Sequence, residues 1–173
     1  MIVRRTTRAA GILTAAAIAI VTVTATGGSA QTPGGRTITF FEDGRTGTFA
    51  FIDNPPRSPV SNPDSPKARF SLGDQAAFSE RLLDRKGGNP VGRVFATETV
   101  MAGSRFPRVT ELIHAIFRLR DGQIVIDAAV DERHPDDVRA AVTGGTGAYE
   151  GARGTFTTHS GTAGNSDQIR LLP

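Results

Sequence analysis

The stretch that decides the fold reads Ala141-Val142-Thr143-Gly144-Gly145-Thr146-Gly147-Ala148-Tyr149-Glu150-Gly151-Ala152-Arg153-Gly154-Thr155-Phe156. A short β-favouring run enters it, another leaves it, and five glycines lie between them. Glycine is used where the backbone needs a positive φ or a close approach to another segment. The stretch therefore predicts a strand, an irregular glycine turn and a second strand.

A second strong signal lies just before this stretch. The β-favouring runs 111–120 and 123–130 flank Asp121-Gly122. An Asp-Gly pair between two such runs is typical of a tight β-hairpin. Further strands are expected, on β-branched and aromatic composition, at 37–41, 48–53, 91–101, 139–143, 154–159 and 168–172, with a turn at 42–45.

Two segments do not read as regular strands. Residues 68–84 contain helix formers and also alternate like a strand, so both interpretations stay open. Residues 54–66 hold five of the ten prolines. Since proline cannot donate to a sheet ladder, this segment is expected to be a surface loop.

The count of about eight short strands, with no long helix, predicts an all-β fold. Antiparallel barrels and sandwiches both fit this spacing. A last strand able to meet the first favours closure into an eight-stranded antiparallel β-barrel, because closure removes the exposed sheet edges.

Residues 1–30 have the pattern of a secretory signal peptide. Arg4, Arg5 and Arg8 precede an uncharged apolar run, and Gly28-Ser29-Ala30 offers small residues to a signal peptidase. The alternative is a membrane anchor, for which the run is short. We expect cleavage after Ala30, a secreted, extracellular protein, no membrane span after cleavage, and a single domain over 31–173.

Composition limits the classes of partner. The chain has 20 Lys and Arg against 17 Asp and Glu, and three of the arginines lie within residues 1–30. Residues 31–173 are therefore formally neutral, which gives no support for a nucleic-acid partner. There is no cysteine, so the domain is expected to depend on its core and not on disulfides.

The order of landmarks resembles the allene oxide cyclase and dirigent superfamily. The matching pieces are Arg57-Ser58-Pro59, Ser71-Leu72-Gly73-Asp74 with Phe78 and Leu82, Asp121-Gly122-Gln123-Ile124, and the glycine stretch with Tyr149-Glu150-Gly151. The resemblance covers roughly residues 36–172. It implies an eight-stranded antiparallel barrel with an apolar interior, often trimeric, so a homotrimer is expected. It also implies chemistry on an apolar small molecule without a cofactor.

The chain departs from the plant allene oxide cyclases at their interior polar positions. Glu80 stands at the position of their asparagine, Glu98 at that of their cysteine and Val130 at that of their tyrosine. Asp53 is the nearest carboxylate to their acidic residue at the end of the second strand. The plant reaction is therefore not transferred to this chain.

If the register of the resemblance holds, eight side chains face the interior: Phe78, Glu80, Val94, Ala96, Glu98, Ile126, Ala128 and Val130. Burial and a like-charged neighbour raise the pKa of a carboxyl group. We therefore take Glu80 and Glu98 as the candidate catalytic acid and base. The alternative places both acids at the barrel rims, solvated or paired with arginines.

Asp53, Phe78, Val130 and Tyr149 are the candidate ligand-binding residues. Asp74 is expected to bind backbone amides in its Gly-Asp turn and to be structural. The three histidines, His114, His134 and His159, are not spaced as metal ligands usually are, so no metal site is expected.

Functions from three classes remain open at this point, the third being a structural or envelope-associated β-domain whose cavity is filled by its own side chains. One is a secreted, cofactor-free cyclase or isomerase, or a stereochemical guide, acting on an apolar small molecule inside the barrel. The alternative is a non-catalytic, lipocalin-like barrel that binds such a molecule without turnover.

Overall fold

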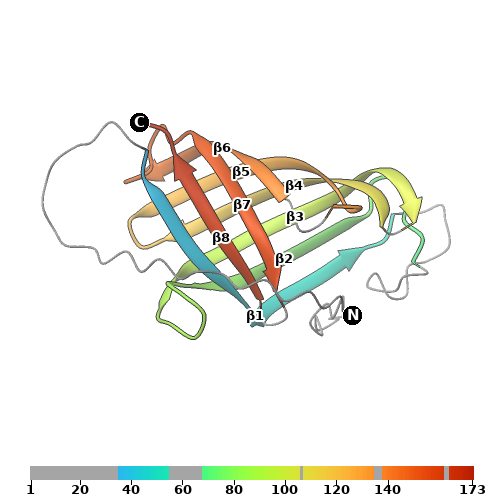
Figure 1. Ribbon diagram of the computed structural model, residues 1–173. Helices are drawn as coiled ribbons and strands as arrows, with labels where there is room; N and C mark the ends of the chain where they lie inside the picture. Colours follow the sequence, from blue (N-terminus) through green and yellow to red (C-terminus); the bar gives the residue numbers. More distant parts are fainter. Residues whose placement is uncertain (1–34, 55–67, 106, 135–137, 162–163) are drawn as a thin grey trace, which may run out of the picture.

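The computed structural model describes residues 35–54, 68–105, 107–134, 138–161 and 164–173. In these residues eight antiparallel strands close into one barrel in chain order (Figure 1). The strands are β1 (Thr37–Ile52), β2 (Gln75–Leu83), β3 (Pro90–Arg105), β4 (Arg108–Leu119), β5 (Gly122–Asp131), β6 (Val138–Gly147), β7 (Gly154–Gly161) and β8 (Gly164–Leu171). The predicted all-β, eight-stranded antiparallel barrel is confirmed. The expected signal peptide, 1–30, and the proline-rich segment from residue 55 onward lie outside the described residues.

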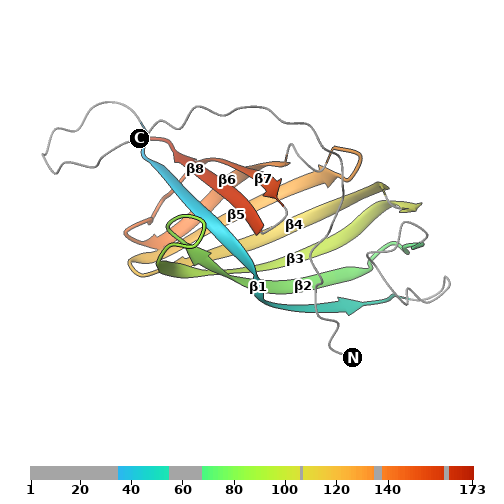
Figure 2. The ribbon, with the colours of Figure 1, turned by 60° about the horizontal axis from the view of Figure 1, so that its bottom comes forward.

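The first strand differs from the sequence prediction. Two strands with a turn at 42–45 were expected, whereas β1 is one strand that bends sharply in its middle (Figure 2). Asp43 pairs with Arg81 and Thr48 pairs with Ser79, so residues 44–47 lie opposite the single residue Glu80. Such a bulge changes which side chains point inward and bends the strand. As a result the first half of β1 pairs with β8, and both halves pair with β2.

The glycine stretch also differs in detail. Strand β6 continues through Gly144 and Gly145, which pair with Val125 and Ile124 of β5, and the turn begins only after Gly147. Gly147 has a φ of +62°, in the left-handed region that favours glycine. A Cβ at Gly145 would lie 2.3 Å from the carbonyl oxygen of Tyr149. The glycines therefore allow a strand to pass close under a tight turn.

In the segment 68–84, which the sequence left open between helix and strand, residues 68–74 form a short irregular stretch and strand β2 follows it. Asp74 is the last residue before β2 and is fully buried. Its carboxylate accepts hydrogen bonds from the backbone amides of Asn54 and Ser71, both at 2.8 Å. The predicted structural role of Asp74 is confirmed.

The core lies inside the barrel and is built from side chains of all eight strands. It is largely aliphatic, with a group of aromatic rings from β1, β4 and β7. Phe117 stacks on Phe40 at 6.1 Å between ring centres and meets Phe156 at 5.3 Å. The core members include Phe40, Leu82, Val94, Ala96, Ala115, Phe117, Ile124, Ile126, Ala140, Val142, Phe156 and Ile169.

Candidate active site inside the barrel

Three carboxyl groups lie buried on three neighbouring strands. Glu42 lies on β1, Glu80 on β2 and Asp167 on β8, and these residues are 6%, 4% and 3% exposed. Strand β1 pairs with both of the other two strands. Carboxylates are seldom buried this completely, because their removal from water is costly. These acids therefore form the candidate active site, called here the inner acid cluster.

The strand period places the inner acid cluster on the interior face. Successive side chains of a strand point to opposite faces, so residues two apart share a face. Each acid lies two residues from a member of the core on its own strand, and these core members are Phe40, Leu82 and Ile169. The three acids therefore point into the barrel.

The contact between Glu42 and Asp167 follows from the register of β1 and β8. Asn165 lies opposite Glu42, and Asp167 lies opposite Phe40, so Asp167 is the diagonal neighbour of Glu42 on the same face. The Asn165 side-chain amide donates a hydrogen bond of 3.0 Å to Oε2 of Glu42. The other oxygen of Glu42 is left to interact with Asp167.

Burial raises the pKa values of both carboxyl groups. The pKa of Glu42 is raised well above its usual value by burial and then by the charge of Asp167. The pKa of Asp167 is raised by burial to about 6. The hydrogen bond between the two groups raises the pKa of Glu42 and lowers that of Asp167, which is the pattern of a protonated Glu42 donating to an ionised Asp167. Both carboxyl groups are therefore weaker acids than usual, and their titrations are coupled.

Two residues of the neighbouring strand β7 also affect the pKa of Asp167. Thr158 and His159, on β7, both lower the pKa of Asp167, and the charge of Glu80 raises it. Apart from the Glu42 carboxyl and the Thr158 hydroxyl, no side chain in the described part of the chain donates a hydrogen bond to Asp167. Asp167 is thus a buried acid whose hydrogen-bonding capacity is incompletely used.

The bulge in β1 makes room for Glu80. A Cβ at Gly44 would lie 3.7 Å from Oε2 of Glu80, and a Cβ at Gly47 would lie 3.2 Å from its Cγ. The glycines of the bulge therefore face the Glu80 side chain, and a larger residue at position 47 would press on it. The same bulge that bends β1 also accommodates the third acid of the cluster.

The structure separates the two predicted catalytic acids. Glu80 is buried and faces inward, as expected. Glu98 is half-buried and pairs with Ala76, four residues along β3 from Val94, the partner of Glu80. Four residues of strand span about 13 Å. The like-charged neighbours of Glu80 are therefore Glu42 and Asp167, and Glu98 is not part of the inner acid cluster.

The predicted ligand-binding residues lie at several levels of the barrel. Phe78 packs against the core, and Val130 is buried near the end of β5. Asp53 is half-buried just beyond β1. Tyr149 is buried in the turn after β6, with the Arg36 guanidinium 5.5 Å from its ring centre. Their roles toward a ligand stay predictions.

Sequence reasoning missed Glu42 and Asp167. Glu42 continues the alternation of Ile38 and Phe40, which would have placed it on the inner face had the strand not been ended at residue 41. Asp167 likewise precedes the alternating Ile169 by two residues. Extending each predicted strand by one period would have found both acids.

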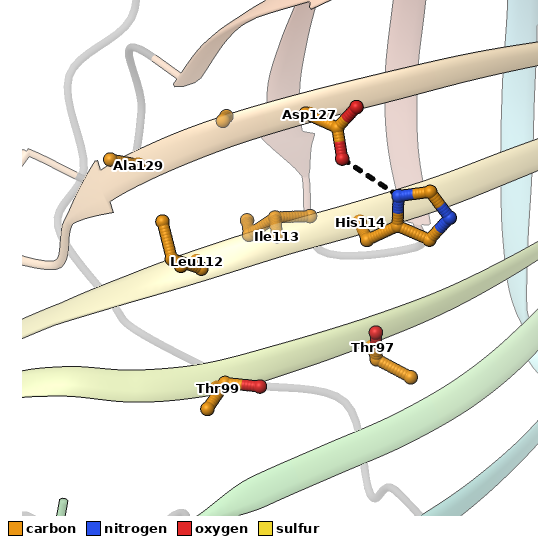
Figure 3. Close-up of a pocket in the computed structure, with 8 residues that line it drawn as sticks. Thr97, Thr99, Leu112, Ile113, His114, Asp127 and Ala129 are labelled. Carbon is orange, nitrogen blue, oxygen red and sulfur yellow. Dashed lines mark hydrogen bonds and ion pairs between the residues drawn. The ribbon is translucent and has the colours of Figure 1, made fainter. Parts of the chain in front are cut away.

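A second polar cluster lies on the outer surface of the barrel. His114 of β4 and Asp127 of β5 are cross-strand partners, and His114 Nδ1 lies 2.7 Å from Asp127 Oδ1 (Figure 3). The Thr143 hydroxyl donates to Asp127 Oδ2 at 2.6 Å. These bonds, that of Thr143 first, lower the pKa of Asp127. We call these three residues the outer cluster.

The outer cluster borders a shallow groove of about 520 Å³. The groove is lined by Thr97, Thr99, Leu112, Ile113, His114, Asp127, Ala128 and Ala129. His114 and Asp127 are each about half exposed. The groove is therefore a feature of the outer sheet surface, separate from the inner acid cluster.

Two other features are absent from the described ranges. They contain no group of three or more His, Asp or Glu side chains arranged to hold a metal ion. They also contain no helix long and apolar enough to cross a membrane.

Comparison with known proteins identifies relatives of the fold. No protein-family model matches the sequence, and no curated protein matches it. Among solved structures, the chain is similar to a pyocyanin demethylase, with a TM-score of 0.62 and 19% identity over 79% of this chain and 100% of that chain. It is also similar to the pterocarpan synthase dirigent protein GePTS1, with a TM-score of 0.54 and 15% identity over 85% and 96% of the two chains.

A third similar structure is the Diels-Alderase AbmU from Streptomyces koyangensis. The TM-score is 0.53, with 13% identity over 80% of this chain and 70% of that chain. At these identities the likeness establishes the fold alone. The barrel is a fold shared with dirigent proteins and Diels-Alderases, which confirms the resemblance drawn from the sequence.

Proposed function

We propose that the protein binds an apolar small molecule inside the barrel and catalyses its isomerisation or cyclisation by acid–base chemistry, without a cofactor. The observation that carries this proposal is the pair of Glu42 and Asp167, two buried neighbouring carboxyl groups whose pKa values are both raised by burial. Two acids whose pKa values are pushed apart supply an acid and a base at the same pH. Support also comes from the fold, which dirigent proteins and Diels-Alderases share.

The pair is suited to a proton shift within one substrate. Ionised Asp167 takes a proton from a carbon or oxygen atom of the substrate, and neutral Glu42 gives its proton to another atom of the same molecule. The substrate keeps its composition. The proton gained by Asp167 then passes to Glu42 and exchanges with solvent as the product leaves, which restores the starting state of the enzyme. The negative charge of Glu80 raises the pKa values of both partners and so strengthens Asp167 as a base.

Small side chains lie beside the inner acid cluster. Ala96 is the diagonal neighbour of Glu80 across the β2–β3 pair, and its own partner on β4 is Ala115. Both alanines are buried in the core, where larger residues fill the neighbouring positions. A substrate bound here would be held against apolar walls, and such positioning lowers the entropic part of the barrier.

The experiment uses the protein purified from its secreting host and a small-molecule extract of that host in D₂O. We expect chromatography with mass spectrometry to show a product isomeric with a consumed compound and carrying one deuterium from the solvent. Glu42→Gln and Asp167→Asn should each reduce this conversion at least 100-fold, which is the usual scale of general acid–base catalysis. Asp127→Asn, on the outer surface, is the matched control and should leave the conversion unchanged.

Two other outcomes would decide against catalysis. A compound that co-purifies with the protein and is recovered unchanged would favour the alternative, a lipocalin-like binding barrel. Conversion that survives in both Glu42→Gln and Asp167→Asn would contradict the assigned acid and base. Native mass spectrometry of the same sample would also report a homotrimer.

We further propose that residues 1–30 direct export and are removed. Support comes from the basic start, the uncharged apolar run and the small residues that end at Ala30. The exported protein should then begin at Gln31, which its intact mass measures directly. A mass that retains residues 1–30 would contradict this proposal.

A further inference from the structure

Three arginines form a row across the neighbouring strands β2, β3 and β4 (Figure 1). Arg81 pairs directly with Arg93, and Arg93 pairs directly with Arg118. Residues directly opposite each other in an antiparallel pair have Cβ atoms about 5 Å apart, and like charges at such positions destabilise the sheet. This set, called here the arginine row, therefore costs the fold stability, and a bound anion would relieve that cost.

The arginine row lies on the outer face of the barrel. The residue next to each arginine along its strand belongs to the core, and these neighbours are Leu82, Val94 and Phe117. Successive side chains of a strand point to opposite faces, so the three guanidinium groups point away from the core. The row is therefore within reach of a dissolved molecule.

The acids beside the arginine row are paired with other arginines. Asp43 lies opposite Arg81, but its two carboxylate oxygens accept hydrogen bonds from Arg45 at 2.8 and 3.2 Å. At the other end of the row the partner of Arg118 is Gln123, which carries no charge. Within the described ranges, the ion pairs include none of the three arginines of the row. The row therefore holds an excess of positive charge.

Two guanidinium groups of the row are held in place by their neighbours. Arg93 Nη1 donates a hydrogen bond of 3.0 Å to the Ser79 hydroxyl, which is itself 2.9 Å from the hydroxyl of Thr48. The Arg118 guanidinium lies 5.2 Å from the ring centre of Phe95. A guanidinium group has five N–H donors in a fixed plane, so both groups keep donors for the oxygens of a carboxylate or a phosphate.

An apolar groove of about 440 Å³ lies beside the arginine row. Its lining includes Ser79, Phe95 and Ile116, each two residues from an arginine of the row on the same strand. Residues two apart share a face and lie about 7 Å from each other. Phe95 is 38% exposed, which is unusual for a large apolar side chain. A molecule with its anionic group at the row would thus place an apolar body in the groove.

We infer that the arginine row and this groove form a second binding site, outside the barrel, for a dissolved small molecule with a phosphate group on an aromatic ring. The phosphate lies against Arg93 and Arg118, and the ring packs on Phe95 and Ile116. A phosphate monoester carries close to two negative charges at neutral pH, so it balances more of the row than one carboxylate does. None of these residues belongs to the inner acid cluster, so the site goes beyond the proposed function.

The test compares 1-naphthyl phosphate with two probes that each carry half of its chemistry. Neutral 1-naphthol has the ring alone, and inorganic phosphate has the charge alone. Calorimetry at pH 7.5 should show that 1-naphthyl phosphate binds about tenfold more tightly than either, because hydrogen bonds to charged groups and ring burial each contribute. Added sodium chloride should weaken its binding by screening the row. This salt dependence needs no variant.

Variants place the binding on the outer surface. Arg93→Gln and Arg118→Gln should each weaken the binding of 1-naphthyl phosphate about tenfold, since each removes a charged donor. Phe95→Ala should weaken it as well and leave the binding of inorganic phosphate unchanged. The matched control is Arg170→Gln, which removes an exposed arginine of β8, four strands away from β4 around the barrel. This control should bind 1-naphthyl phosphate as the natural protein does.

Four results would overturn the inference. Equal affinities for 1-naphthyl phosphate and 1-naphthol would remove the role of charge, and equal affinities for 1-naphthyl phosphate and inorganic phosphate would remove the role of the groove. Unchanged affinity in both Arg93→Gln and Arg118→Gln would place the probe elsewhere. Binding to vesicles of phosphatidylcholine and phosphatidic acid, without binding of 1-naphthyl phosphate, would assign the row to a lipid surface instead of a dissolved molecule.

Discussion

Asp167 and Asp127 are the same residue type in the same barrel, and their pKa values move in opposite directions. Asp167 faces the interior, where burial raises its pKa to about 6. Asp127 lies on the outer surface, where hydrogen bonds from Thr143 and His114 lower its pKa. The outer acid is about half exposed and hydrogen-bonds to Thr143 and His114, whereas the inner acid is buried beside Glu42. The surroundings, and not the residue type, decide which acid can exchange protons at neutral pH.

The largest difference between the two clusters should appear in the stability of Asp167→Asn. A carboxyl whose pKa is raised on folding stabilises the folded state below the unfolded pKa near 4 and loses that contribution as the pH rises through about 6. Asp167→Asn should therefore match the natural protein at pH 4 and be more stable at pH 8, by about 3 kcal/mol. Urea unfolding at the two pH values measures this difference.

The matched variant at the outer surface should behave in the opposite way. The lowered pKa of Asp127 stabilises the folded state above the unfolded pKa near 4, and this contribution is lost as the pH falls through the lower folded pKa. Asp127→Asn should therefore give no gain in stability at pH 8. If both asparagine variants gain stability at pH 8, the contrast between the clusters is wrong.

A smaller effect is expected from the hydrogen bond within the outer cluster. Thr143→Val removes the 2.6 Å bond to Asp127 and nearly preserves side-chain shape. Since Asp127 is about half exposed and water replaces the lost donor, the cost should be about 0.5–1 kcal/mol at pH 7. Thermal unfolding measures it, and the cost should shrink below pH 4. An equal cost at pH 3 and pH 7 would show that the bond does not depend on the charge of Asp127.

The contrast also explains what the sequence could and could not predict. The register of the resemblance correctly placed Glu80, Val94 and Ile126 inside, where the structure buries all three side chains. The segment 42–45 read as a turn, since Glu-Asp-Gly-Arg favours one. Only the pairing of both halves of β1 with β2 makes it a bulge inside one strand.

The sequence did not place Asp167 on a strand for a related reason. It follows Gly164-Asn165-Ser166, a polar run typical of loops, and becomes part of a strand because β1 and β7 pair with it on either side. Propensity does not report such long-range pairing. The inner acid cluster is assembled from these two segments and from Glu80, so the sequence predicted one of its three members.

The central claim is that Glu42 and Asp167 are a coupled pair of buried acids whose pKa values are both raised. Carbon-13 NMR of the side-chain carboxyl groups, titrated from pH 3 to pH 9, tests it directly. We predict that Asp167 titrates near pH 6, that Glu42 titrates well above its usual pKa, and that Glu80→Gln lowers both pKa values by removing a repulsive charge. Asp127 should titrate below its usual pKa in the same spectra. Titration of both Glu42 and Asp167 near pH 4 would contradict the claim.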